Sequence, residues 1–175
     1  MKRKLTLALV ILSLGGFLFS QNLKIAVIDP DKILNESKEG KKILSELQSY
    51  YQRKQAEINR RTKEVESLQQ KLRTQQGILS QSALQKLADQ LDEKQKALKR
   101  YVDDANEEMN KLKQKKLAAF QQKMVVIINK VAKRKGILTI FDRRQLIYAD
   151  PIVDISSEII AELDKEFEKS MGLGK

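Results

Sequence analysis

The central part of the chain repeats its apolar residues every seven positions. One position of six successive heptads is apolar, whereas the position three residues later is mixed and includes Lys54 and Arg61. A seven-residue apolar repeat is typical of a coiled coil, in which helices pack along a narrow seam. The pattern predicts a long helix with an imperfect seam. Its six apolar positions are Leu44, Tyr51, Ile58, Val65, Leu72 and Leu79.

A second repeat runs from Leu84 to Leu112, and the apolar face then widens between Phe120 and Val131. A wide face indicates packing against a globular core. The stretch "QQGILSQS" between the two repeats is rich in turn-favouring residues. We therefore expect an antiparallel helical hairpin over residues 41–135 with its tip near 76–82, ending at Gly136 as a left-handed cap.

Three cations, Lys133, Arg134 and Lys135, precede that glycine. Cations in the last turn of a helix stabilise the negative end of its dipole, and we prefer this interpretation to a binding patch.

The two ends of the chain have strand character. Residues 23–28 form an apolar run, with Asp29 as an expected helix cap and Pro30 as the first helical residue. Later, residues 137–141 and 146–148 are rich in β-branched and aromatic side chains and flank a turn-like stretch, which predicts a β-hairpin. An antiparallel arm returns the chain to its start, so these distant segments can share one sheet.

Ser156 is the expected cap of a terminal helix that would lie on this sheet. The predicted fold class is therefore α+β: residues 21–40 and 136–175 form a small three-stranded β/α body from which a long antiparallel coiled-coil helical hairpin projects. Such a body leaves a sheet edge unpaired, so we expect several copies to associate through it. The residues expected in this oligomerisation body are Ile25, Val27, Leu138, Ile140, Ile147 and Ile160.

Residues 1–20 resemble an export signal. Lys2-Arg3-Lys4 is followed by an uncharged apolar run to Phe19 and by Ser20, a small residue. At ~1.5 Å per residue the run spans ~22 Å, which is short for a transmembrane helix. We expect cleavage of residues 1–20 as a signal peptide; an uncleaved anchor is the alternative.

Charge is concentrated on the predicted arm. Of the 175 residues 33% are charged and only 5% are aromatic, and the formal net charge is +11. Residues 41–135 contain 23 Lys and Arg against 11 Asp and Glu, a balance of +12. A basic surface attracts acidic chains and anionic lipid.

The sequence offers no apparatus for catalysis. It contains no His, no Cys and no glycine-rich phosphate loop. Acidic pairs such as Asp103-Asp104 and Glu107-Glu108 are expected to form a solvated helix face rather than a carboxylate site. We therefore expect no catalytic residue, no cofactor and no metal ligand.

The stretch "KIAVIDPDKILNESKEGKK", a long coiled-coil hairpin and then "GILTIFDRRQLIYADPIVDISSEII" together resemble the Skp (OmpH-like) family of periplasmic chaperones. The likeness covers essentially the whole mature chain and depends on the order of its parts. It implies a homotrimer whose arms surround a cavity. It also implies a periplasmic holdase that binds unfolded outer-membrane proteins and prevents their aggregation without ATP.

The arm residues are the expected contacts for such clients, because aliphatic stems and tyrosine rings offer weak contacts that tolerate many sequences. For any single cation, a place in the helix seam is the stronger interpretation. Anionic lipid or lipopolysaccharide is a further candidate partner. The expected client-binding residues are Tyr50, Tyr51, Arg53, Lys54, Arg60, Arg61, Lys71, Arg73, Lys94 and Tyr101.

Two other functions compete with this one. Nonspecific nucleic-acid binding would use the positive charge, but the export signal opposes it and we expect no specific nucleic acid as partner. An amino-terminally anchored structural coiled-coil protein of the cell envelope is the stronger alternative, and it requires residues 5–19 to stay in the mature chain.

Overall fold

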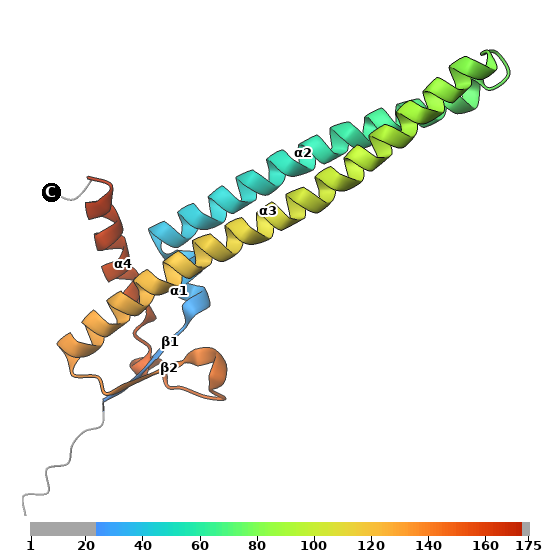
Figure 1. The fold of residues 1–175 in the computed structure, drawn as a ribbon. Coiled ribbons are helices and arrows are strands. Elements are labelled where there is room, and N and C mark those ends of the chain that lie inside the picture. Colours follow the sequence, from blue (N-terminus) through green and yellow to red (C-terminus); the bar gives the residue numbers. More distant parts are fainter. Residues whose placement is uncertain (1–23, 173–175) are drawn as a thin grey trace, which may run out of the picture.

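A computed structural model describes residues 24–172, and Figure 1 shows their arrangement. Two long helices, α2 (Lys38–Gln75) and α3 (Gln81–Lys135), lie side by side as a projecting hairpin. The other elements gather at the end of this hairpin that lies opposite its turn. The predicted helical hairpin is thus confirmed, and the described chain is mostly helical.

Strand β1 (Ile25–Ile28) leads directly into the short helix α1 (Pro30–Glu36). The Asp29 carboxylate accepts hydrogen bonds from the backbone N–H groups of Asp31 and Lys32, each at 3.0 Å. These bonds satisfy donors that would otherwise be free at a helix start, and Pro30 fits there because its missing N–H is not needed. The expected roles of Asp29 and Pro30 are confirmed.

The junction between α1 and α2 is tight. Ser37 is fully buried, and its hydroxyl accepts a hydrogen bond from the Gly40 N–H at 3.2 Å. A Cβ on Gly40 would lie 2.0 Å from the Leu34 carbonyl oxygen, so only glycine fits this position. The close approach sets the angle at which the arm leaves the base.

The arm turns at residues 76–80, and Ser80 caps the start of α3 by accepting a hydrogen bond from the Ala83 N–H. At its other end α3 stops at Gly136, whose φ of 66° is left-handed, as predicted. Within the last turn of α3, Arg134 pairs with Glu162 of the terminal helix at 2.6 Å, a partner additional to the expected helix dipole.

The hydrophobic core lies at the base of the arm. There the widened face of α3 packs against α1, the start of α2 and the terminal helix α4 (Ser156–Ser170). Along the middle of the arm the seam is thinner, with Val65 and Ala105 buried. One end of α3 is therefore more deeply buried than the other, as its pattern predicts. Core side chains include Ile28, Ile33, Ile43, Leu47, Phe120, Met124, Ile127, Val131, Ile155, Ile159 and Leu163.

Strand β2 (Thr139–Asp142) pairs in parallel with β1, from Ile25 opposite Thr139 to Ile28 opposite Asp142. More than a hundred residues separate these strands in the sequence, and the arm connects them (Figure 1). The expectation that the early and late segments share a sheet is confirmed.

The predicted β-hairpin is wrong. After β2 the Asp142 carboxylate accepts hydrogen bonds from the Arg144 N–H at 2.9 Å and from its guanidinium at 2.6 Å. These contacts wind residues 143–145 into a short 3-10 helix instead of a two-stranded turn. Residues 146–148 consequently form no strand with β2.

The predicted three-stranded sheet has two strands in the described residues. The free edge of β1 is covered by a single bridge between Val27 and Asp154, next to the 3-10 helix Pro151–Val153. The Ile155 N–H donates to the Val27 carbonyl at 3.0 Å. A short extended contact thus stands where a third strand was expected.

Ser156 is not the cap of α4, which is also a correction. It is the first helical residue, and its buried hydroxyl accepts a hydrogen bond from the Asp29 N–H at 2.8 Å. Ile155 occupies the cap position without a capping side chain, and the Asp154 carboxylate before it accepts a hydrogen bond from the Ser156 N–H at 2.8 Å. Ser156 therefore ties the terminal helix to the end of β1.

Candidate functional site on the helical arm

Four of the expected client-binding residues meet near the middle of the arm, at a polar crossing between α2 and α3. Lys54 extends between two aromatic rings, with its Nζ 5.4 Å from the centroid of Tyr50 and 5.3 Å from that of Tyr101. Arg61 stacks on Tyr101 at 4.3 Å. Cations over aromatic faces are attracted by the ring quadrupole. These side chains therefore join the two helices where the seam lacks aliphatic residues.

Glu108 on α3 completes this crossing from the opposite helix. Its carboxylate lies 2.6 Å from the Lys54 Nζ and accepts a hydrogen bond from the Tyr50 hydroxyl at 2.6 Å. The hydrogen bond from Lys54 lowers the pKa of Glu108, and the same contact raises the pKa of Lys54. Both groups stay charged at neutral pH, so their attraction persists there.

A second ionic group continues along α2 toward the tip. The Glu57 carboxylate accepts hydrogen bonds from Arg60 and Arg61, each at 2.7 Å. The hydrogen bond from Arg60, helped by that from Arg61, lowers the pKa of Glu57 to about 2. Arg60 also pairs with Glu64, which Lys94 of α3 reaches at 3.3 Å. The side chains of Arg60, Arg61 and Lys94 are thus engaged in ion pairs with residues of the same arm.

The other predicted contacts are spread more widely. Arg53 lies 5.7 Å from the ring centroid of Tyr50, whereas Tyr51 is exposed although its heptad position predicts a seam contact. Lys71 and Arg73 lie farther along α2, near the tip, apart from the central crossing. The structure therefore brings together Tyr50, Lys54, Arg61 and Tyr101, with Arg53 at their side, and leaves Tyr51, Lys71 and Arg73 apart from them.

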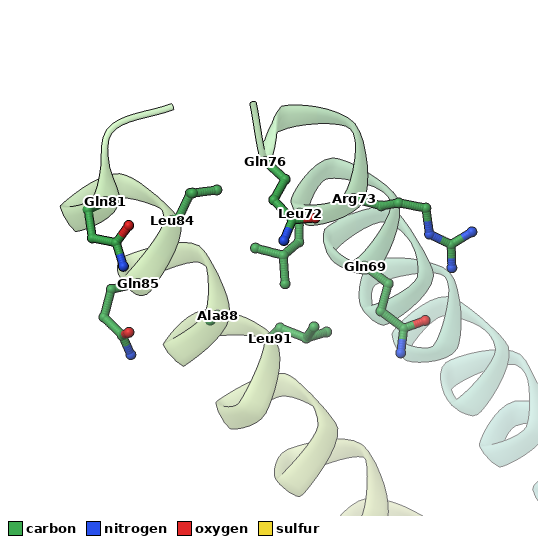
Figure 2. A pocket seen from close by; sticks show the side chains of 9 residues that line it. All are labelled: Gln69, Leu72, Arg73, Gln76, Gln81, Leu84, Gln85, Ala88 and Leu91. Carbon is green, nitrogen blue, oxygen red and sulfur yellow. The ribbon is translucent and has the colours of Figure 1, made fainter. Parts of the chain in front are cut away.

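An open groove lies at the tip of the arm, where the seam between α2 and α3 is not filled (Figure 2). Leu72 of α2 and Leu84 and Leu91 of α3 point into the space between the helices, and the small Ala88 leaves room beside them. All four side chains stay half-exposed. Apolar surface thus remains accessible to a partner at this end of the molecule.

The rim of this groove is made of amides and one guanidinium. Gln69 comes from α2, Gln76 directly follows that helix, Gln81 and Gln85 come from α3, and Arg73 lies beside Gln69. Sequence reasoning missed these glutamines because Gln gives no periodic or charge pattern. A recognisable feature was available: residues 67–88 contain six Gln and no Asp or Glu.

The base of the arm exposes a second apolar surface, around β2 and the loop that follows it. Phe141, Tyr148 and Ile152 are exposed there. Of the residues expected in the oligomerisation body, three are exposed: Ile25, Leu138 and Ile147. The other three pack within the single chain, Val27 fully and Ile140 and Ile160 partly.

Within residues 24–172 no group of three or more His, Cys, Asp or Glu side chains is placed to hold a metal ion. Over the same range, no helix combines the length and apolarity needed to cross a bilayer. Glu108, considered in the sequence as part of an acidic pair, acts here as an interhelical partner.

Comparison with known proteins gives one family. The family described as "Outer membrane protein (OmpH-like)" matches residues 24–163. An uncharacterized protein of Aquifex aeolicus (strain VF5) is 30% identical over 152 residues, which cover 87% of this chain and 91% of that protein.

A solved structure shares the fold. It is that of a proposed outer membrane chaperone (OmpH-like) from Caulobacter crescentus CB15, with a TM-score of 0.75 at 22% identity. The match covers 82% of this chain and 85% of that one.

Proposed function

The chain belongs to the OmpH-like outer membrane protein family, and on that premise we propose that it is an ATP-independent holdase chaperone. It binds unfolded outer-membrane proteins between helical arms and prevents their aggregation. One observation carries this proposal: a two-helix arm projects far beyond the small core and keeps both basic and apolar surface exposed along its length. No catalytic step is part of the proposed role.

The arm suits a client that has no fixed shape. Its exposed cations attract acidic segments over about a Debye length, ~8 Å at physiological salt. Its apolar contacts are small and separate, so no single client sequence is required. Electrostatic attraction gathers the chain, and the apolar surface retains it. Anionic lipid and lipopolysaccharide are further partners that this charge would favour.

We place the protein in the periplasm as a homotrimer. The proposal of export depends on residues 1–20, which lie outside the described residues. Association through the base is supported by the exposed Leu138 and Phe141 and by the outer edge of β2, which pairs with no strand in residues 24–172. Exposed sheet edges and apolar patches are commonly covered by partner chains. Three copies joined in this way would enclose a cavity between their arms.

The test is the aggregation of a urea-denatured outer-membrane β-barrel protein after dilution, with and without the mature chain. We expect light scattering by the client to fall in proportion to chaperone concentration without nucleotide, because binding withdraws the unfolded state. Higher salt should weaken client affinity. Unchanged aggregation at excess chaperone would refute the holdase function, and salt-independent affinity would refute the electrostatic step.

Sequencing the mature amino terminus separates this proposal from its main alternative. Cleavage near Ser20 agrees with a free periplasmic chaperone. Retention of residues 5–19, together with no effect on client aggregation, would favour an anchored structural protein of the envelope.

A further inference from the structure

We infer that the groove at the tip of the arm binds one extended polypeptide segment whose apolar side chains are flanked by acidic residues. This inference rests on the proposed chaperone function and deepens it, because it gives the client a place on the arm and a chemistry. The groove belongs to a single hairpin, so it needs no second copy.

The floor of the groove accepts apolar side chains. Leu72 of α2 and Leu84 and Leu91 of α3 are half-exposed, and Leu72 faces the two α3 leucines across the gap beside Ala88 (Figure 2). From Leu84 to Leu91 the floor runs ~10 Å along α3, which about three or four residues of an extended chain would cover. Burying even one leucine-sized side chain there is favourable, because apolar surface leaves water on both partners.

The rim offers hydrogen bonds to a backbone. The side chains of Gln69, Gln76 and Gln81 take part in no hydrogen bond within the described residues, while Gln85 donates to Asp89 at 2.9 Å. A carboxamide both donates and accepts, as a peptide group does. An unfolded segment has free N–H and C=O groups, so it can pair with these amides whatever its sequence.

The charge of the tip selects acidic neighbours. Residues 67–88 carry Lys71, Arg73 and Lys86 and no acidic side chain. None of these three cations is in an ion pair in the part of the chain that the structure describes, whereas the cations of the central crossing and of the ionic group next to it are paired with Glu57, Glu64 or Glu108. The positive field at the tip is therefore uncompensated and complements Asp or Glu on a partner.

A polypeptide fits this site better than an anionic membrane does. The apolar side chains lie recessed between two helices, where a flat bilayer cannot reach them. Ile78, 81% exposed, is the one large apolar side chain that the tip projects strongly in the described residues. A second tip is also a poor occupant, because like charges would repel.

The test uses the mature full-length chain and two fluorescent peptides. One carries leucines flanked by aspartates, and its counterpart has a lysine for each aspartate. At about 3.3 Å per residue, peptides of roughly ten residues extend well beyond the groove. At low salt we expect the Kd of the acidic peptide to be at least about tenfold lower than that of the basic peptide.

Two variants locate the site. Ala88→Leu fills the groove without changing charge and should weaken the acidic peptide by about tenfold or more, as loss of an anchoring pocket does. Its control, Ala119→Leu, adds the same side chain at an exposed position of α3 and should leave Kd unchanged. Lys71→Glu with Arg73→Glu should abolish the acid preference, whereas Lys113→Glu with Lys115→Glu, an equal charge change on α3 away from the tip, should not.

Several results would overturn the inference. Equal binding of the two peptides, or normal binding by both tip variants, excludes the site. If the tip variants instead lost binding to phosphatidylglycerol vesicles but kept the peptide, the tip would be a membrane contact. Should Ala88→Leu fail to fold by circular dichroism, the double charge variant decides alone.

The client assay separates this inference from the proposed function. Normal suppression of aggregation by variants that fold and bind the peptide normally leaves the holdase standing and removes the tip site. If the chain binds the peptide through its tip but never suppresses aggregation, the tip site stands and the holdase function falls.

Discussion

Gly40 controls how the arm leaves the base, because its missing side chain lets two helices approach. An added Cβ would lie 2.0 Å from the Leu34 carbonyl oxygen and 2.8 Å from the Ser37 Oγ. Neither atom can move freely, since one is backbone and the other belongs to a fully buried residue. The helix junction must shift if any other residue stands here.

Gly40→Ala should therefore destabilise the protein by about 2 kcal/mol or more, the size of effect seen when a packed site is overfilled. Gly77→Ala is the matched control. It lies at the arm's turn with nothing within 4 Å, so the free energy of unfolding should change by less than about 1 kcal/mol. Urea denaturation followed by circular dichroism measures both. Equal stability of the two variants would contradict the close approach.

Glu57 makes the stability of the arm depend on pH in the acidic range. Hydrogen bonds from Arg60 and Arg61 lower its pKa from an ordinary value of 4.5 to about 2. Folding thus favours the ionised carboxylate. Its stabilisation is complete above the unfolded value and is lost as the pH falls from there toward about 2.

Glu57→Gln should lower the thermal midpoint of helix melting at neutral pH. The difference from the unsubstituted chain should shrink as the pH falls below about 4.5, because protonation of Glu57 then removes from the unsubstituted chain the charge that the variant already lacks. Glu66→Gln provides the control, since Glu66 is exposed on the same helix and is in no ion pair among the described residues. A pH-independent difference would show that packing rather than charge is responsible.

At the scale of elements, helix α4 is attached to β1 and α1 by a few polar contacts around an apolar face. The Ser156 hydroxyl accepts from the Asp29 N–H, and the Lys38 N–H donates to the Asp164 carboxylate at 2.7 Å. Ile159 and Leu163 lie beneath these contacts in the core. The terminal helix therefore fixes the start of both α1 and α2.

Ser156→Ala should cost about 1–3 kcal/mol, because the Asp29 amide loses its partner in a place that water reaches poorly. Ser157→Ala, one position along the same helix, removes an exposed hydroxyl that Lys32 contacts at 3.3 Å and should change stability little. Thermal melts of both variants test this. A neutral Ser156→Ala would mean that water replaces the hydroxyl.

The elements differ in how well the sequence predicts them, for physical reasons. The helices of the arm follow from their heptads, and the ends at Asp29 and Gly136 follow from local backbone chemistry. The prediction of a β-hairpin was wrong because β-branched residues at 146–148 indicate extended backbone but do not specify a partner strand. Contacts of Asp142 with Arg144 stabilise a 3-10 helix there instead, and such side-chain contacts leave no periodic pattern in the sequence.

The candidate site shows the same division. Tyr50, Lys54, Arg61 and Tyr101 are four of the ten residues that the sequence predicts as client contacts, because aromatic and basic residues stand out along a helix. The sequence does not predict that they meet one another and Glu108, since a carboxylate on a charged helix is usually solvated. The groove at the tip depends on Ala88 being too small to fill the seam, which only the facing helix reveals.

At the scale of the whole molecule, charge divides the chain into a basic arm and a mildly acidic base. Residues 41–135 carry +12, whereas residues 21–40 and 136–175 together hold 8 Lys and Arg against 12 Asp and Glu, a balance of −4. In the proposed trimer the arms would repel one another while apolar contacts hold the bases together. A cavity between arms would then stay open until an acidic client neutralises its walls.

The proposed association through the base can be tested with one substitution. Leu138 is 63% exposed and borders the sheet, so Leu138→Asp should leave the subunit folded but place a charge in the interface. Light scattering should show about three times the mass of the mature chain for the unsubstituted protein and a shift toward one chain for the variant. Ile78→Asp places the same charge at the exposed tip and should keep the larger mass. A single-chain mass before any substitution, or an unchanged mass in Leu138→Asp, would contradict a trimer joined at the base, and the arms would then act singly.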